Sequence, residues 1–277
     1  MPLLSLDLKS TFRCYSYLRR LCSYYTNSVL TELSQQYQVS VRTLQTCFDK
    51  VIVSEPCVEA QQLPINLLLD ATFFSRRDGV LILRADRKNL HRRFIETESL
   101  SDVAAGFDVL DKQGHHFKSV TIDGRKGVIG LIQARYPGVP IQMCQFHQAM
   151  IIRRYTTNRP KTECGKALKI VMRQLTLATQ DVFASLVNSL REEYDDFLKE
   201  RNEQGQFKHR QLRSAFRSLK TNLPYLFTYQ QYPELNIPNT TNSCDGSFAH
   251  WKQKVKIHRG LPRLRRNKMI DFLLNQP

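Results

Sequence analysis

Residues 65–74 read INLLLDATFF, an apolar run that an acid, Asp70, interrupts. The isoleucine and leucines of its first half are typical of a buried β-strand, and we expect that strand to end at the acid. A second run, SVTIDGRKG at 119–127, reaches Asp123 in the same way. Because the ends of adjacent strands meet at one edge of a sheet, we expect the two carboxylates to lie close together.

A third acid, Asp245, lies in NTTNSCDGSF at 239–248. Asparagine, threonine and serine, the types that cap helices, precede it, so Asp245 is expected in the first turn of a helix that could reach the two strand ends. Buried carboxylates that lie close together repel one another unless they are protonated or share a bound cation. The pattern therefore predicts a two-metal site of the kind that clamps the attacking and leaving oxygens in phosphoryl transfer.

From 65 to 270 the chain resembles the Mutator-like transposases of bacterial insertion sequences. The strings that carry this resemblance are IDGRKG at 122–127, CQFHQ at 144–148, RSAFRSLKTNLPYLFTY at 213–229, and NTTNSCDG through HRGL at 239–261. The resemblance implies a ribonuclease H-like core with an Asp-Asp-Glu triad. It makes Asp70, Asp123 and Asp245 the catalytic residues and the ligands of two Mg²⁺ or Mn²⁺ ions.

The third acid departs from the family pattern, which usually has Glu within Leu-Glu-Gly where this chain has Cys244, Asp245 and Gly246. Asp is one methylene shorter, and Mg²⁺ tolerates little deviation from octahedral geometry at about 2.0–2.1 Å. Two hypotheses follow: an active DNA transposase that cuts transposon ends and joins them to target DNA, and a catalytically inactive DNA-binding derivative. A third, a structure-selective ribonuclease H-like nuclease, would cut without joining ends.

Composition favours a nucleic-acid partner. The chain has 41 Lys and Arg against 25 Asp and Glu, a net charge of +16 and a pI near 9.7, and such a pI is typical of nucleic-acid binders. A solvated, solubilising surface is the alternative explanation of this charge. The basic residues are grouped: Arg84, Arg87, Lys88, Arg92 and Arg93; Arg153 and Arg154; Arg210, Arg213, Arg217 and Lys220; and eight between 252 and 268, where no acid occurs.

Double-stranded DNA, as transposon terminal repeats and as target, is the partner that the resemblance implies. We expect at least a dimer, because transposases hold two ends in a multimer, and this expectation comes from family analogy alone. The residues predicted to contact DNA are Arg42, Arg125, Lys126, Lys252, Lys254, Lys256, His258 and Arg259.

Cys144 and His147, three residues apart, match a motif found in the same family. His147 is expected to contact a DNA phosphate or to order the wall of the active site; the alternative is a hydrogen-bonded histidine beside a buried thiol. The chain has seven cysteines at irregular spacings without a C-x-x-C pair, which argues against a zinc finger and against a disulfide scaffold.

Residues 1–60 are expected to form a separate helical unit, and 54–63 a linker. Residues 31–48 have the rhythm of a helix-turn-helix in which Ser40 caps the second helix and Arg42, Thr43 and Gln45 begin a recognition helix. An ordinary helical hairpin packed on the core is the alternative.

The order of predicted elements in 61–277 agrees with an α/β, ribonuclease H-like mixed sheet. We expect strands at 65–69, 80–83 and 93–98 with a turn at 78–79, and then a helix, the strand of Asp123, a helix at 127–135 and a strand at 139–144. A helical insertion is expected at about 150–238. Its apolar stripe is Phe183, Leu186, Leu190 and Phe197, and Phe248 and Trp251 are expected to pack the last helix.

No apolar run approaches the roughly 18 residues of a membrane span, and the N-terminus has no continuous apolar signal segment. We therefore expect a cytoplasmic, nucleoid-associated bacterial protein that does not contact membranes.

Overall fold

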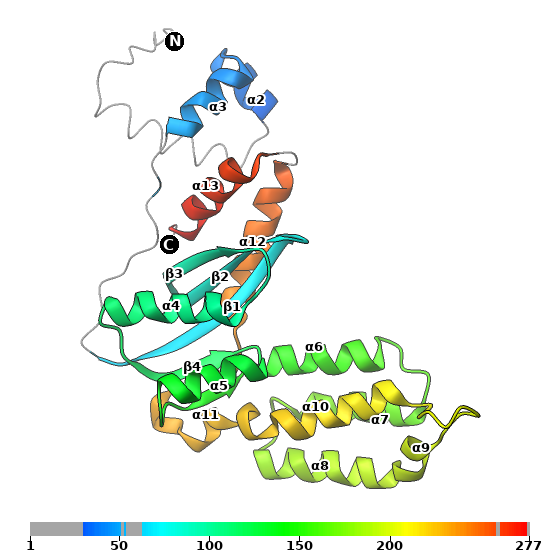
Figure 1. Ribbon diagram of the computed structural model, residues 1–277. Helices are drawn as coiled ribbons and strands as arrows, with labels where there is room; N and C mark the ends of the chain where they lie inside the picture. The colour runs from blue at the N-terminus through cyan, green and yellow to red at the C-terminus, as the bar shows by residue number, and fades with distance from the viewer. Residues whose placement is uncertain (1–29, 51–52, 54–62, 259–260, 276–277) are drawn as a thin grey trace.

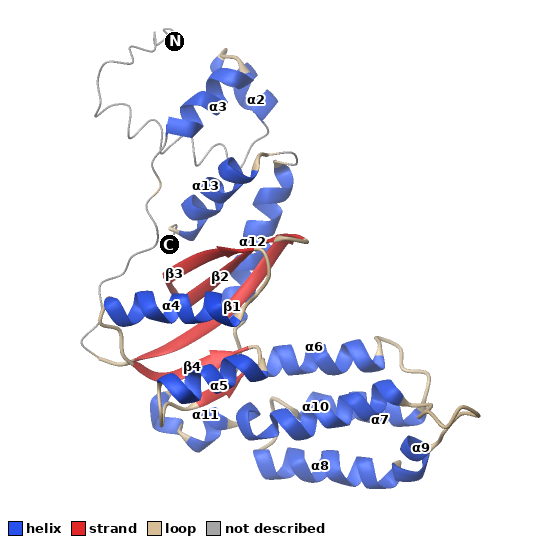
Figure 2. Cartoon of the chain, in the orientation of Figure 1, coloured by secondary structure: helices blue, strands red, loops and turns tan. Residues whose placement is uncertain are grey.

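One five-stranded mixed sheet lies at the centre of the protein (Figures 1 and 2). The computed structural model describes residues 30–50, 53, 63–258 and 261–275. Strand order is β3-β2-β1-β4-β5; β2 is antiparallel to β1 and β3, whereas β1, β4 and β5 are parallel. The protein is therefore an α/β protein, as predicted. The strands are β1 Ile65–Ser75, β2 Asp78–Ala85, β3 Lys88–Ile95, β4 Phe117–Ile122 and β5 Ile141–Met143.

The first hairpin turns earlier than predicted. Asp78 and Gly79 belong to β2, and the turn is formed by the two residues before them. Asp78 is buried against the guanidinium of Arg266, with which it forms an ion pair, and Gly79 lies under the ring of Phe73, where a Cβ atom would come within 2.7 Å. Both residues are thus held in the strand, and the prediction of a turn at 78–79 was wrong.

The second hairpin turns at Asp86 and Arg87, whose φ values are +47° and +65°. Two successive left-handed residues form the tight turn whose twist matches that of the flanking strands. As a result β3 begins at Lys88 and ends at Ile95, several residues before the predicted strand at 93–98.

Successive side chains of a strand point to opposite faces of the sheet, and here both faces carry buried apolar side chains. Helices α4 (Leu100–Lys112) and α5 (Lys126–Arg135) cover one face, where Leu67, Leu69, Val120 and Ile122 are buried. Helices α12 (Asn242–Ile257) and α13 (Arg263–Leu274) cover the other, over Leu68, Val80 and Ile82. Even-numbered residues of β1 therefore point toward α12 and α13.

The chain between β5 and α12 is mostly helical, as predicted, and has its own core beside the sheet (Figure 1). Phe183 and Leu190 are buried as expected, but Leu186 is exposed and Val187 is buried in its place. The elements are α6 Gln145–Thr156, α7 Glu163–Val171, η1 Met172–Gln174, α8 Gln180–Glu193, α9 Asp195–Lys199, α10 Arg210–Leu226, α11 Thr228–Gln231 and η2 Pro233–Leu235. None of the helices that the structure describes is long and apolar enough for a membrane span.

Two N-terminal helices, α2 (Leu30–Tyr37) and α3 (Val41–Lys50), are joined by a short turn. Ser40 caps α3 as predicted, because its Oγ accepts the N–H of Thr43 at 3.0 Å. Leu33, Leu44 and Phe48 are buried in the same cluster as α12 and α13, so the pair packs on the C-terminal helices, while Arg42 stays exposed. Residues 1–29 and most of the predicted linker lie outside the described residues.

Candidate functional site

Two of the predicted acids lie at matching positions, Asp70 within β1 and Asp123 directly after the neighbouring strand β4. Leu68 of β1 pairs with Thr121 of β4, and Asp70 and Asp123 each follow two residues later. The hydroxyl of Ser119 donates to Asn66 Oδ1 at 2.6 Å, so the residues of this parity share one face. Because paired strands lie about 4.8 Å apart, this register brings the two acids together.

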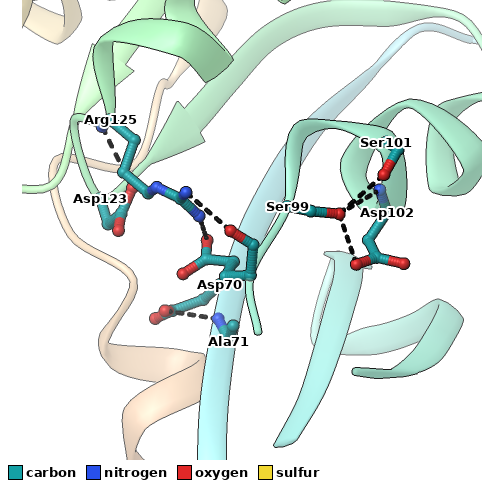
Figure 3. Close-up of polar contacts among 8 residues, drawn as sticks. Asp70, Ala71, Ser99, Ser101, Asp102, Asp123 and Arg125 are labelled. Atoms are coloured by element: carbon teal, nitrogen blue, oxygen red, sulfur yellow. Dashed lines mark hydrogen bonds and ion pairs between the residues drawn. The ribbon is translucent and has the colours of Figure 1, made fainter. Parts of the chain in front are cut away.

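Asp70 does not close its strand, contrary to the prediction. β4 ends at Ile122, but β1 continues to pair with β2 as far as Ser75. Asp70 therefore lies in the middle of β1, two residues beyond the last residue that pairs with β4. The carboxylate is 5% exposed, and its Oδ1 accepts the N–H of Ala71 at 2.8 Å (Figure 3).

The first turn of α12 lies beside Asp70. Cys244 is buried in one cluster with Leu68 of β1. Burial and the negative charge of Asp70 together raise the pKa of the Cys244 thiol to about 12. Asp245 is the fourth residue of α12, in the first turn as predicted. Its side chain lies outside the described part of the structure. A helix N-terminus carries a partial positive charge, which favours nearby carboxylates.

Arg84 fixes α12 to the sheet. It is 8% exposed, and its Nη1 donates to the carbonyl oxygen of Ser243 and, at 2.9 Å, to Ser247 Oγ. Arg92 holds α13 in the same way, because it donates two hydrogen bonds to Asp271 at 2.5 and 2.9 Å. Arg84 and Arg92, which belong to a basic group in the sequence, therefore hold the C-terminal helices in place.

Asp123 is held by the loop that follows it. Its Oδ1 accepts the N–H of Arg125 at 3.2 Å (Figure 3). The Arg125 guanidinium forms an ion pair with Glu98 at 3.0 Å and donates to the Glu98 carbonyl at 2.7 Å. Arg125, predicted to contact DNA, thus lies within the site and half-exposed, whereas the neighbouring Lys126 is fully exposed.

Glu98 is a site residue that the sequence reasoning missed. Burial raises the pKa of its carboxyl, the charge of Asp123 raises it further, and Arg125 opposes both. Glu98 directly precedes Ser99, which caps α4 by accepting the N–H of Asp102 at 3.1 Å (Figure 3). The sequence feature that could have identified Glu98 is its position between the end of a strand and the capped start of a helix.

Cys144 and His147 tie the end of β5 to the start of α12. The buried Cys144 Sγ accepts the N–H of Thr241 at 3.3 Å, and Thr241 Oγ1 lies 3.4 Å from His147 Nδ1. Burial acts to raise the pKa of the Cys144 thiol, but hydrogen bonds from His147 and Thr241 outweigh it and lower the pKa below its ordinary value. The thiol is buried, as the packing interpretation expects, while His147 remains partly exposed.

The predicted DNA contacts on α12 differ in exposure. Lys252 and Lys256 are exposed and Lys254 is partly exposed. His258 is only 6% exposed, so its ring is not available at the surface, contrary to the prediction. Arg259 lies outside the described residues. Phe248 and Trp251 are 5% and 4% exposed with ring centroids 5.5 Å apart, and they pack the helix as predicted.

Among the side chains that the structure describes, no three of His, Cys, Asp or Glu form a group that could hold a metal ion. Asp70 and Asp123 supply two acids, and the described side chains do not include the predicted third. No protein-family model matches the chain, and no curated protein matches it significantly.

Proposed function

We propose that the chain is a metal-dependent DNA transposase with a ribonuclease H-like core. The single observation that carries the proposal is the matching placement of Asp70 in β1 and Asp123 directly after the parallel strand β4, beside the first turn of α12. The sheet order supports it, because three antiparallel strands followed by two parallel ones is the ribonuclease H-like arrangement.

The residues fit a divalent metal. Asp70 and Asp123 offer carboxylate oxygens, the ligands that Mg²⁺ and Mn²⁺ prefer, and the buried Asp70 carboxylate is costly to ionise unless a cation or hydrogen bonds compensate its charge. Asp245 would complete the set from α12. Two bound ions would activate the attacking oxygen and stabilise charge at phosphorus.

The proposed reaction consists of two displacements at phosphorus. Water cleaves a strand at the transposon end, and the 3′-hydroxyl that is freed then attacks a phosphodiester of the target. Both steps are the same type of reaction, so one set of acids serves both, without a covalent protein intermediate. In each step Arg125 keeps Asp123 oriented through its backbone N–H, and Arg84 keeps α12 against the sheet.

A catalytically inactive, DNA-binding derivative is the second candidate. Asp245, in the position where the resemblance expects Glu, is the observation that favours it. The shorter side chain must reach the same cation from the same helix, and metal sites tolerate misplacement of only about half an ångström.

A cleavage and joining assay tests both candidates. The substrate is a duplex carrying the DNA that flanks the gene, with Mg²⁺ or Mn²⁺, and the variants are Asp70→Asn, Asp123→Asn and Asp245→Glu. Asp86→Asn is the matched control, because Asp86 is exposed and its positive φ suits asparagine.

An active transposase cuts and joins in the wild type and in Asp86→Asn, and it loses both activities in Asp70→Asn and Asp123→Asn. Activity only in Asp245→Glu identifies an inactivated transposase. Cutting without joined products identifies a nuclease, and wild-type cleavage by Asp70→Asn rules out the proposed site.

A further inference from the structure

The helical region between β5 and α12 carries a row of cations along α10. Arg210, Arg213, Arg217 and Lys220 recur at intervals of three and four residues, so they lie along one side of the helix. Arg217 and Lys220 are exposed, and Arg191 of α8, also exposed, faces them across a cavity of about 200 Å³. Three exposed cations from two helices therefore surround one opening.

The cavity is a shaped feature of the fold. Leu198 and Phe216, 3% and 4% exposed, form its apolar floor. Its one acid, Asp195, forms an ion pair with Lys199, so the charge of the opening is strongly positive.

Arg213 is fixed at the edge of this cavity. Its Nη1 donates to the carbonyl oxygen of Leu198 at 3.1 Å, and its guanidinium lies 3.6 Å from the centroid of the Phe207 ring. An ordered guanidinium loses little entropy when it binds an anion, which favours phosphate recognition.

The basic surface continues beyond Arg213. Phe207 lines a larger cavity, of about 610 Å³, at the N-terminal end of α10. Arg159, Lys161, Lys208 and Arg210 lie around it, and no Asp or Glu is among the described residues that line it. The two cavities thus form one cationic track.

The helix that carries the track is anchored to the end of the sheet. At the C-terminal end of α10, the carbonyl oxygen of Leu226 accepts hydrogen bonds from Gln142 of β5 and Gln145 of α6, at 2.9 and 3.0 Å. From this anchor the 17 residues of α10 extend about 25 Å away from the sheet. That length corresponds to roughly seven base pairs of duplex at 3.4 Å per step.

We propose that this surface, formed by α8, α10 and the loop before α10, binds the phosphate backbone of duplex DNA that continues past the active site. The inference rests on the proposed function for the identity of the polyanion. The contacts are with phosphates, so binding is independent of base sequence.

Binding of a fluorescent 30-base-pair duplex to the full chain in EDTA, followed across a KCl series, tests the proposal. The test variant is Arg191→Gln/Arg217→Gln/Lys220→Gln. The control is Arg76→Gln/Arg77→Gln/Lys112→Gln, which removes the same charge from exposed sites on or beside the sheet. Equal thermal stability of the two variants shows that both are folded.

The slope of log affinity against log salt should fall by about 2–3 in the test variant, since each phosphate contact contributes roughly 0.9. Affinity at 0.1 M KCl should fall at least tenfold, and the single variant Lys220→Gln should lower the slope by about 1. The control should change the slope by less than about 1.

Equal effects of the test and control variants, or a wild-type chain that does not bind the duplex, would overturn the proposal. Because EDTA removes divalent metal, binding is measured without catalysis. A chain that binds through this surface but never cuts DNA would therefore refute the transposase assignment and leave the inference standing.

Discussion

Asp70 of β1 and Asp123, the first residue after β4, each lie two residues beyond the pair formed by Leu68 and Thr121 of these neighbouring parallel strands. The first turn of α12 packs on this face of the sheet, where Cys244 is buried in one cluster with Leu68 of β1. Two carboxylates from distant parts of the chain and one helix start thus converge on a single face, and the predictions below concern what holds this arrangement and what it binds.

Divalent metal should stabilise the protein through Asp70. A ligand that binds only the folded state adds about 2.7 kcal/mol when its concentration is 100 times Kd. We therefore expect Mn²⁺ to raise the Tm of the wild type by several degrees and to leave Asp70→Asn unchanged, as measured by differential scanning calorimetry. Without metal, Asp70→Asn should melt at or above the wild-type temperature, because a buried charge is removed.

Asp86→Asn is the control, and it should keep the full response to Mn²⁺ because Asp86 is exposed in the turn after β2. An equal rise of Tm in Asp70→Asn would show that the metal binds elsewhere.

Arg84 should matter more to α12 than either of its partners. Arg84→Met leaves the Ser243 carbonyl and the Ser247 hydroxyl without their donor, and a lost buried hydrogen bond of this kind costs about 1–3 kcal/mol. Urea unfolding should show that loss for Arg84→Met. Ser247→Ala removes one acceptor of Arg84 and the hydroxyl that donates to the Ser243 carbonyl at 3.1 Å, but it leaves the hydrogen bond from Arg84 to that carbonyl, and it should cost about 1 kcal/mol or less. A larger loss in Ser247→Ala than in Arg84→Met would contradict this role of Arg84.

Two ion pairs that join α13 to the rest of the protein should differ in strength. Asp271 and Arg92 have side chains only 11% and 14% exposed, so Asp271→Asn leaves a poorly solvated cation and should cost about 3 kcal/mol. The Asp49 side chain is 47% exposed in its pair with Arg265, and Asp49→Asn should cost less than about 1 kcal/mol. Urea unfolding at pH 7 measures both, and equal costs would refute the difference.

The Asp49 pair should also make α3 sensitive to acid. The hydrogen bond from Arg265 lowers the pKa of Asp49, so the folded state holds this carboxyl ionised more strongly than the unfolded state does. Its contribution is complete above the unfolded pKa of about 3.9 and is lost as the pH falls through the lower folded pKa. The stability difference between wild type and Asp49→Asn should therefore shrink toward zero below about pH 3.5. A difference that stays constant from pH 7 to pH 3 would contradict this linkage.

Substitution of Cys144 should mainly lower stability, whereas substitution of His147 should mainly lower catalysis. Cys144 is fully buried and accepts from Thr241, so Cys144→Ala should lower the free energy of unfolding by about 1–2 kcal/mol. His147 is partly exposed next to the site, and His147→Ala should reduce cleavage at least tenfold with a smaller loss of stability. Full cleavage by a folded His147→Ala protein would leave the pair a purely structural role.

Local patterns predicted much of the fold. The structure confirms the α/β class, the helix predicted before the strand of Asp123, that strand itself and the helix at 127–135. It also confirms the cap at Ser40 and the placement of Asp245 in a first turn. Each depends on side chains within a few residues of one another, which a sequence displays directly. The predicted turn at 78–79 was wrong because its reason is not local: Asp78 pairs with Arg266, far along the chain.

The sequence by itself determined which residues carry charge and in what order strands and helices follow one another, and from this came Asp70, Asp123 and Asp245 as the candidate acids. Only the tertiary structure decided how the cations are used. It buries Arg84 and Arg92 as supports for α12 and α13, places Arg125 against Glu98, and leaves Arg217 and Lys220 exposed. The physical reason is that a guanidinium is equally basic in every sequence context, whereas its role depends on which carbonyl, carboxylate or solvent the folded chain places beside it.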